Sequence, residues 1–213
     1  MVPVPAVENA EAADRPATAQ PRWERYSWRT LGRGPRPMLL AACDLFGPGE
    51  GRTAVDLGCG AGVDSLALLA RGWSVTAIDK DPAGLDLLTA RIPPESAGRV
   101  RIVRAAFSEV VLPRADLVHA GYSLPFSPAG QFAKLWAGIR DALRPGGVFA
   151  GQLFGLRDSW AATARMSFHD PEQVAKLLEG LVVLRLDETE WDGDALSGPK
   201  HWHVYDILVR RLA

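Results

Sequence analysis

Several features that often decide a protein's class are scarce in this sequence of 213 residues. It has only two cysteines, Cys43 and Cys59, whose spacing excludes a disulfide framework and a four-cysteine zinc site. We therefore expect a reducing, cytoplasmic setting. No apolar run approaches the roughly 18 residues of a transmembrane helix, and the first residues lack the basic and apolar segments of a secretory signal. We expect neither feature.

Excess charge is also missing, since 24 basic residues face 25 acidic ones and the net charge is −1. This balance gives no global field that would hold nucleic acid or an anionic membrane surface, so we expect neither as a partner. Histidine is scarce, and the His201-x-His203 pair has no evident third ligand, so we expect no metal site. The acidic residues between 187 and 194 fail the calcium-loop spacing, which predicts a solvated loop over 187–200.

What is present is ordinary globular composition, with 47% hydrophobic and 23% charged residues. The length favours one domain, because domains average about 150 residues. Residues 1–21 are rich in proline and lack periodicity, which predicts a disordered tail. Residues 22–213 are expected to form the single domain. Within it, residues 22–48 are predicted to be a helical segment that either packs on the domain or acts as a lid.

Short apolar runs alternate with amphipathic segments from residue 53 onward. This alternation predicts an α/β fold: a doubly wound, mostly parallel seven-stranded sheet with an antiparallel last strand and helices on both faces. The predicted strands are 53–57, 74–78, 100–104, 117–120, 148–154, 182–186 and 202–210. The predicted helices are 38–46, 63–71 and three more that open at Asp81-Pro82, Ser127-Pro128 and Asp170-Pro171.

A glycine-rich turn follows the first predicted strand, in the sequence VDLGCGAG from Val55 to Gly62. Glycines there let a ligand approach the backbone, and the next helix start favours an anionic group. Asp79 ends the second strand, where a carboxylate can accept hydrogen bonds from a ribose. A dinucleotide site would place a third small residue at Val63. The pattern therefore disfavours an NAD-dependent oxidoreductase, which stays the alternative enzyme class.

Three segments together resemble motifs of class I S-adenosylmethionine-dependent methyltransferases. They are VDLGCGAG, the pair Ile78-Asp79 at the end of the second predicted strand, and the turn LRPGGVF over 143–149. The resemblance covers about residues 50–210, and small bacterial enzymes of the tellurite-resistance and thiopurine types are similar in size and layout. It implies S-adenosylmethionine as cofactor and a small-molecule acceptor. A non-catalytic module that binds this cofactor is a further alternative, and the chain could be a monomer or a homodimer.

Carried over by position, the resemblance places Asp56 and the glycine loop at the methionine end of the cofactor, Asp79 at its ribose, and Lys80 with Ala106-Phe107 at its adenine. The acidic residue that many members have after the third strand is absent, and only Glu109 follows. The implied cofactor-binding residues are Asp56, Gly58, Cys59, Gly60, Gly62, Asp79, Lys80, Ala106, Phe107 and Gly121.

The segment after the fourth strand lies beside the reacting sulfur in this family. The motif of DNA amino-methyltransferases is missing there. The expected acceptor-binding residues are Tyr122, Ser123, Phe126, Trp160 and His169. A base is needed only if the acceptor carries a proton, and Tyr122 and His169 are the predicted catalytic residues, with His119 also considered. Alignment of the reacting groups is expected to supply most of the rate.

Overall fold

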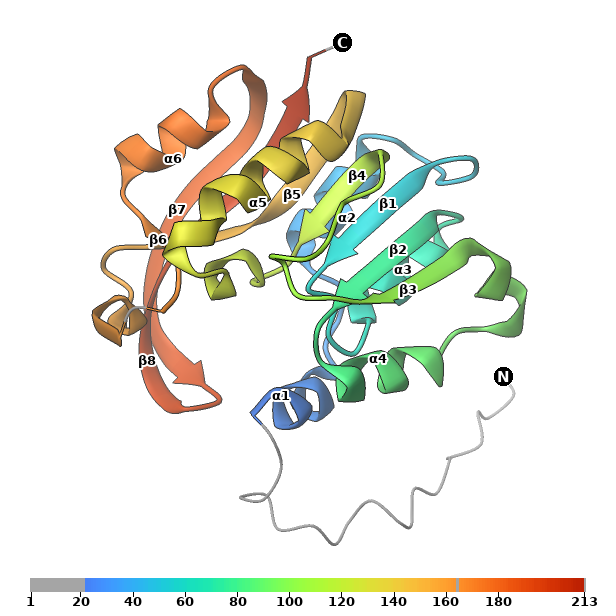
Figure 1. Ribbon diagram of the computed structural model, residues 1–213, viewed down its shortest axis with the longest axis horizontal. Coiled ribbons are helices and arrows are strands. Elements are labelled where there is room, and N and C mark those ends of the chain that lie inside the picture. Colours follow the sequence, from blue (N-terminus) through green and yellow to red (C-terminus); the bar gives the residue numbers. More distant parts are fainter. Residues whose placement is uncertain (1–21, 164, 213) are drawn as a thin grey trace, which may run out of the picture.

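The computed structural model describes residues 22–163 and 165–212, and it shows a twisted sheet between two layers of helices (Figure 1). The predicted tail over 1–21 lies outside these residues. The strands run in the order β3-β2-β1-β4-β5-β8-β7. All neighbours are parallel except β8, which is antiparallel to both β5 and β7. The predicted seven-stranded sheet with an antiparallel last strand is therefore confirmed, and one short extra strand, β6, pairs with β5.

The strands of the parallel half follow the predicted apolar runs. They are β1 Thr53–Leu57, β2 Ser74–Asp79, β3 Val100–Arg104, β4 Ala115–Ala120 and β5 Leu143–Gly155. Fully buried side chains such as Val55, Leu117 and Phe149 explain why these runs are continuous rather than alternating, because helices cover both faces. The fifth strand begins earlier than predicted, because Leu143 already pairs with Ala115 of β4. Residues 144–147 lie at an irregularity in the register, and regular pairing resumes at Val148.

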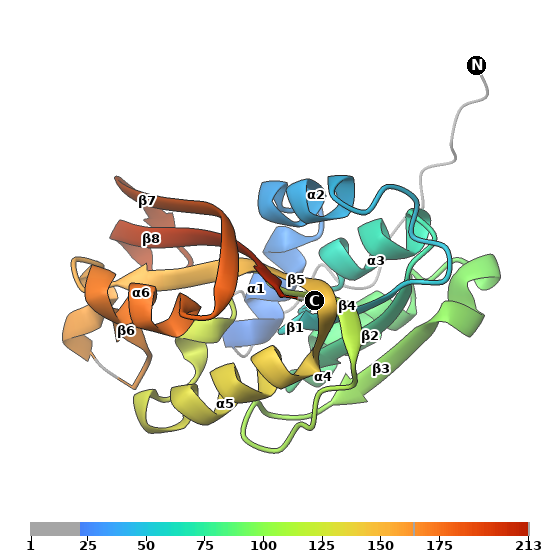
Figure 2. The same cartoon turned by 90° about the horizontal axis from the view of Figure 1, so that it is seen from above.

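Helices lie on both faces of the sheet (Figure 2). Two apolar cores, one on each face, hold them there. One face carries α2 Pro37–Asp44, α3 Val63–Ala70 and α4 Pro82–Thr89, packed around Leu68, Trp73 and Leu88. The other carries α5 Ala129–Ala142 and α6 Pro171–Leu178, packed around Trp136 and Val174. Asp170, where a helix was predicted to open, forms a capping box with Gln173 at the start of α6. Among the described residues, no helix is long and apolar enough to cross a membrane.

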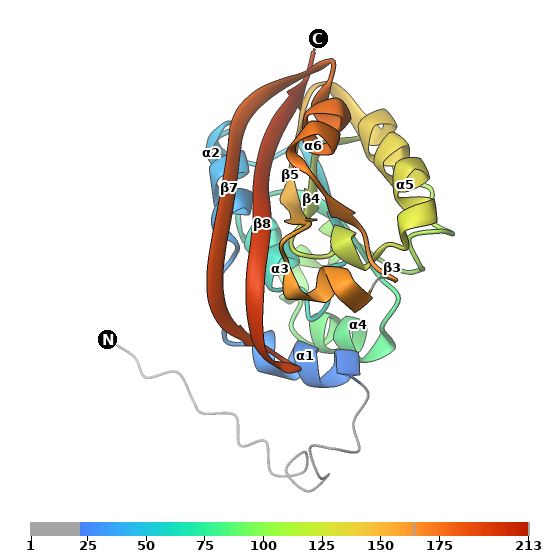
Figure 3. The ribbon, with the colours of Figure 1, turned by 90° about the vertical axis from the view of Figure 1, so that its left-hand side faces the viewer.

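The end of the chain departs most from prediction. Strands β7 Leu181–Ala195 and β8 Gly198–Arg211 form one long hairpin, so the predicted loop over 187–200 is wrong (Figure 3). Asp and Glu disfavour strands, but here they face cross-strand partners: Glu188 opposes Tyr205 and Glu190 opposes His203. The two-residue strand β6, Phe168–His169, was also not predicted.

The N-terminal segment is helical, as predicted, and forms α1 Arg22–Thr30. It lies beside α4 at the end of the sheet where the parallel strands finish (Figure 1). The stretch that leads from α1 to α2 is fastened to α3. The Arg33 guanidinium donates two hydrogen bonds to the Asp64 carboxylate, at 3.1 and 2.5 Å, and the Arg36 backbone N–H donates a third at 2.8 Å.

Candidate active site

A cavity of about 770 Å³ opens at the carboxyl ends of the parallel strands. Its lining includes residues that follow β1, β2, β3 and β4, which is where open α/β sheets bind ligands. Helix α1 and the tip of the β7–β8 hairpin supply the opposite walls. The volume lies inside the range of about 300–1,000 Å³ that is usual for small-molecule sites.

The three glycines of the turn after β1 have positive φ angles, but their surroundings differ. A Cβ on Gly58 would lie 2.3 Å from Ser123 Cβ, and one on Gly62 would lie 2.3 Å from Leu88 Cδ1. These two positions require glycine for packing. A Cβ on Gly60 would meet no atom within 4 Å, and Gly60 lines the cavity. Gly60 is therefore the glycine that leaves room for a ligand.

Asp79, the last residue of β2, connects this strand to the glycine turn after β1 by a hydrogen bond. One carboxylate oxygen accepts a hydrogen bond from the Gly60 backbone N–H at 2.8 Å, and the other accepts one from the Asp81 N–H at 2.9 Å. Asp81 in turn caps α4 by accepting from Gly84 N–H. Asp79 itself lines the cavity. Its carboxylate is thus held in a fixed orientation by two backbone N–H groups, with acceptor capacity left for a ligand. Beside it, the Lys80 ammonium lies 5.7 Å from the Trp23 ring centroid.

Next to the glycine turn, a small hollow of about 30 Å³ is lined by Asp56, Cys59, Gly62 and Gly121, among others. Asp56 is 2% exposed, and burial raises its pKa to about 6, although the Ser65 hydroxyl donates to it at 2.6 Å. Burial alone would also raise the pKa of Asp64, but hydrogen bonds with His119 and Arg33 outweigh it and hold that pKa well below its ordinary value. A buried negative charge therefore stands at this end of the site.

The third strand end contributes Ala105, Ala106 and Phe107 to the cavity lining. Glu109, the acidic residue that follows them in the sequence, is exposed, and its carboxylate accepts a hydrogen bond from the Ala106 N–H at 3.2 Å. It does not line the cavity. This part of the wall thus offers backbone groups and the Phe107 ring rather than a carboxylate.

After β4 the wall becomes aromatic. The rings that line the cavity there belong to Tyr122, Phe126, Phe154, Trp160, Trp191 and Trp202. Tyr122 has a φ of 57°, which is the one positive φ at a non-glycine residue in the part of the chain that the structure describes. Its backbone N–H donates to the Gln152 side chain at 3.1 Å. Strained backbone of this kind concentrates at functional sites.

The structure brings nearly all the predicted site residues together. The 770 Å³ cavity is lined by Gly58, Gly60, Asp79, Lys80, Ala106, Phe107, Gly121, Tyr122, Ser123, Phe126 and Trp160. Asp56, Cys59 and Gly62 line the adjoining hollow. His169 is not brought to either space. It is 8% exposed on β6, its ring centroid lies 4.4 Å from that of Phe132, and burial lowers its pKa to about 4.

The sequence left open whether the segment of α1 packs on the domain or acts as a lid, and it named no residue of α1 or of the hairpin tip as part of the site. Helix α1 and the following stretch supply Tyr26, Ser27, Arg29, Thr30, Arg33 and Arg36 to the lining, and the hairpin supplies Trp191, Asp194, Ala195, Leu196 and Trp202. The density of tryptophan and arginine around residues 22–36 was the available signal for the first group. The second group depends on the length of a hairpin that was predicted as a loop.

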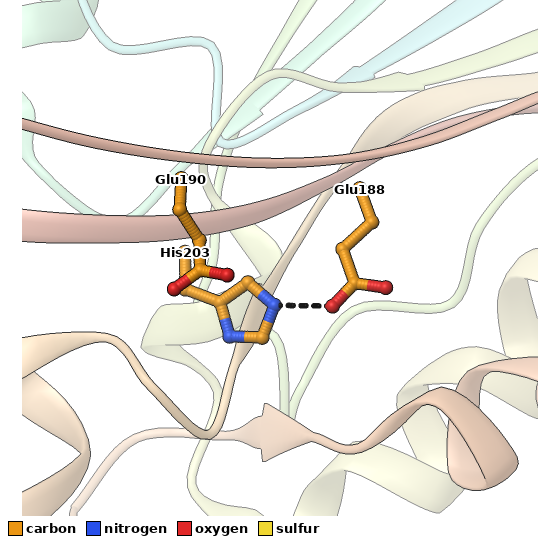
Figure 4. A group of neighbouring side chains, drawn as sticks. All are labelled: Glu188, Glu190 and His203. Atoms are coloured by element: carbon orange, nitrogen blue, oxygen red, sulfur yellow. Dashed lines mark hydrogen bonds and ion pairs between the residues drawn. The ribbon is translucent and has the colours of Figure 1, made fainter.

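A separate group of Glu188, Glu190 and His203 lies on the hairpin, with ligand atoms within 4.8 Å of one another (Figure 4). His203 Nε2 is 2.9 Å from Glu188 Oε1. The Arg157 guanidinium bonds to Glu188 at 2.7 Å and to Glu190 at 2.6 Å, and it lies 3.1 Å from His203 Nε2. An internal cation thus already sits among these groups, and their arrangement is that of a compensated ion-pair network. None of them lines the cavity.

Comparison with known proteins agrees with this geometry. A family model described as a methyltransferase domain matches residues 54–147. Ribosomal RNA small subunit methyltransferase H of Myxococcus xanthus is 39% identical over 83 residues, which are 38% of this chain and 26% of that protein. The cypemycin N-terminal methyltransferase of a Streptomyces species is 34% identical over 128 residues, which are 59% of this chain and 51% of that protein.

The chain therefore spans about half or less of the length of these two relatives. Among solved structures, TehB from Haemophilus influenzae has the same fold, with a TM-score of 0.70 at 14% identity over 88% of this chain and 66% of that one. The family match covers the glycine turn, Asp79 and the strand ends that frame the cavity. Residues 54–147 of this chain are thus similar to a methyltransferase domain, and the chain as a whole has the fold of TehB.

Proposed function

We propose that this protein transfers a methyl group from S-adenosylmethionine to a small-molecule acceptor. The observation that carries the proposal is the Asp79 carboxylate, held by the Gly60 backbone N–H at the edge of a cavity whose far wall is aromatic. One side of the cavity has the backbone and carboxylate chemistry that a nucleoside needs. The other side has room and rings for a second molecule.

In this proposal the donor lies along the glycine turn. Asp79 accepts hydrogen bonds from the ribose hydroxyls, and Gly60 leaves space for the chain that leads to the sulfur. Asp56 faces the methionine ammonium, where its buried charge is compensated when the donor is bound. Ala106 and Phe107 enclose the adenine, whose amino group is held without a carboxylate. Trp23 on α1 and the Lys80 side chain close the cavity above the nucleoside.

The donor supplies an activated methyl group on a sulfonium sulfur. The task of the chain is then to align the acceptor and exclude water, which can account for most of the rate. Gly121, Tyr122 and Ser123 border the place where the two molecules meet. Burial raises the pKa of the Tyr122 phenol above its ordinary value, so it stays protonated at neutral pH. Tyr122 therefore shapes the pocket and can donate a hydrogen bond, but it is a poor resting base.

A small molecule is the proposed acceptor because the aromatic wall lies inside a cavity that α1 and the hairpin tip cover. The net charge of −1 gives no field for nucleic acid. An NAD-dependent oxidoreductase is the alternative enzyme class, but Val63 stands where a dinucleotide site has its third small residue. We propose a cytoplasmic location, in keeping with Cys43 and Cys59, which are both free and buried.

The test is a thermal-shift panel with S-adenosylhomocysteine, NAD and NADP, followed by methyl transfer from labelled donor to an acceptor library. S-adenosylhomocysteine at 100 times its dissociation constant should stabilise the protein by about 2.7 kcal/mol, and the dinucleotides should have no effect. Stabilisation by NAD alone would overturn the proposal. Donor binding without turnover on any acceptor class would instead favour a non-catalytic binding module.

A further inference from the structure

The aromatic side of the cavity forms one continuous wall. Ring centroids are 6.2 Å apart for Tyr122 and Phe154 and 5.7 Å apart for Phe154 and Trp202. Trp160 continues the wall, 5.8 Å from Trp202, and Trp191 stacks on Trp202 at 5.7 Å with an interplanar angle of 8°. A wall of this kind suits two ligand classes: organic cations, through the ring faces, and flat aromatic molecules, through stacking.

The cation class is disfavoured because three of these rings already contact an internal ammonium. Lys200 Nζ lies 3.7 Å from the ring centroid of Trp202, 4.5 Å from that of Trp160 and 4.8 Å from that of Phe154. The Lys200 side chain is fully buried and paired with Asp158, and it does not line the cavity. It therefore stands behind the wall. A second cation in the cavity would compete for the same ring electrons, whereas a flat neutral ring would not.

One arginine beside the wall lacks a counter-charge. The Arg36 guanidinium lies 4.3 Å from the Tyr122 ring centroid and lines the cavity. Its Nε is buried without a hydrogen-bond partner, and its side chain makes no ion pair with any residue from 22 to 163 or 165 to 212. The nearby Arg33 differs, because Asp64 neutralises it. A buried, unpaired guanidinium nitrogen calls for an anionic partner, and a carboxylate fits its planar fork.

We propose that the acceptor is a planar aromatic molecule that carries a carboxylate. Its ring stacks on the wall of Tyr122, Phe154 and Trp202, and its carboxylate pairs with Arg36. This inference rests on the proposed methyl transfer, since it assigns the half of the cavity that the donor leaves open. Asp194 also lines the cavity, at the hairpin tip, and would repel a carboxylate placed there. The charge pattern therefore orients the acid group toward Arg36.

The test measures binding by titration in saturating S-adenosylhomocysteine. The probes are quinoline-2-carboxylate, its neutral amide, cyclohexanecarboxylate and benzyltrimethylammonium, with naphthalene-2-carboxylate and benzoate as larger and smaller aromatic acids. We expect at least one aromatic acid to bind about tenfold more tightly than the amide, the aliphatic acid and the ammonium. Equal binding of acid and amide, tightest binding of the ammonium, or no binding of any aromatic acid would overturn the inference.

The variant Arg36→Gln identifies the partner of the carboxylate. It keeps the backbone N–H that bonds to Asp64, so the link between α1 and α3 remains. We expect it to bind the quinoline acid no better than the amide, with its affinity for S-adenosylhomocysteine unchanged within twofold. Arg29→Gln, at another arginine of the lining, is the matched control and should retain the preference for the acid.

A fall in S-adenosylhomocysteine affinity in Arg36→Gln would place this arginine on the donor and overturn the assignment to the acceptor. The two proposals fail separately. If wild-type protein does not bind S-adenosylhomocysteine, the proposed function fails. If it binds S-adenosylhomocysteine but none of the aromatic acids, only the inference about the acceptor fails.

Discussion

The two sides of the cavity are built in different ways. The glycine-turn side comes from residues 56–79, a single β-α-β stretch, and its key contacts involve backbone groups, such as the bond from Gly60 N–H to Asp79. The aromatic side is assembled from β4, β5, the following turn and the hairpin, and its contacts are between side chains. Backbone geometry recognises the part of a ligand that does not vary. Side chains on separate segments can be exchanged, so we propose that the aromatic side determines which acceptor binds.

The largest expected effect separates packing glycines from the ligand-facing one. Gly62→Ala should lower the free energy of unfolding by about 2–5 kcal/mol, because it combines a positive φ with a Cβ placed against Leu88. Gly60→Ala should cost only about 1–2 kcal/mol, since its Cβ meets open space. Denaturant unfolding measures both. Equal losses would contradict the distinction between these two positions.

The next effect concerns the donor. Asp79→Ala removes the carboxylate that would accept the ribose hydrogen bonds, so S-adenosylhomocysteine binding should weaken by about 1.5–3 kcal/mol. Calorimetric titration measures the loss, and Asp81→Asn, which alters the neighbouring helix cap, is the control. Asp79→Ala with wild-type affinity would remove this residue from the proposed donor site.

A smaller effect is expected in the pH dependence of stability. Burial raises the folded-state pKa of Asp56 to about 6, above its value of about 3.9 in the unfolded chain. The folded state therefore binds more protons between these two values, and Asp56 makes stability fall as pH rises from about 4 to 6. Asp56→Asn should remove this decline and stabilise the protein above pH 6 by on the order of 1 kcal/mol. The free energy of unfolding is measured from pH 4 to 8 for both proteins. If it changes with pH in the same way in wild type and in Asp56→Asn, the proposed effect of burying the Asp56 charge is contradicted.

Where the donor and acceptor are proposed to meet, we expect the loss of the Tyr122 hydroxyl to have little effect on the reaction rate. Tyr122→Phe keeps the ring, so with an identified acceptor the rate should fall less than about tenfold, or 1.4 kcal/mol. A general base would instead cost about 10²–10⁴-fold and remove one limb of the pH–rate profile. Such a loss with unchanged donor affinity would contradict catalysis by alignment alone.

The smallest effect is expected at His169, which the sequence also suggested as catalytic. It packs against Phe132 away from the cavity, so His169→Asn should leave the rate unchanged within about twofold while lowering stability. Steady-state kinetics at matched folded concentration measure this. A rate loss as large as that expected for a general base would require a rearrangement that brings His169 to the acceptor.

The sequence predicts the glycine-turn side of the cavity better than the aromatic side. The parallel strands, the glycine turn and Asp79 depend on local patterns, and the structure has them where the sequence places them. The hairpin was missed because its acidic residues lower strand propensity. Arg157, which lies outside the hairpin, and His201, on its second strand, compensate these acidic residues in the fold. The cavity-facing role of Arg36 has no local pattern either, since it depends on the approach of Tyr122 from β4.

The most direct test of the account compares S-adenosylhomocysteine affinity in three proteins by calorimetry: wild type, Asp79→Ala and Trp191→Leu. Trp191 is 40% exposed at the hairpin and lines the aromatic side, so its replacement should not disturb the fold. We predict a loss of about 10- to 150-fold for Asp79→Ala and less than twofold for Trp191→Leu. Equal losses in the two variants, or unchanged affinity in Asp79→Ala, would contradict a cavity divided into a donor side and an acceptor side.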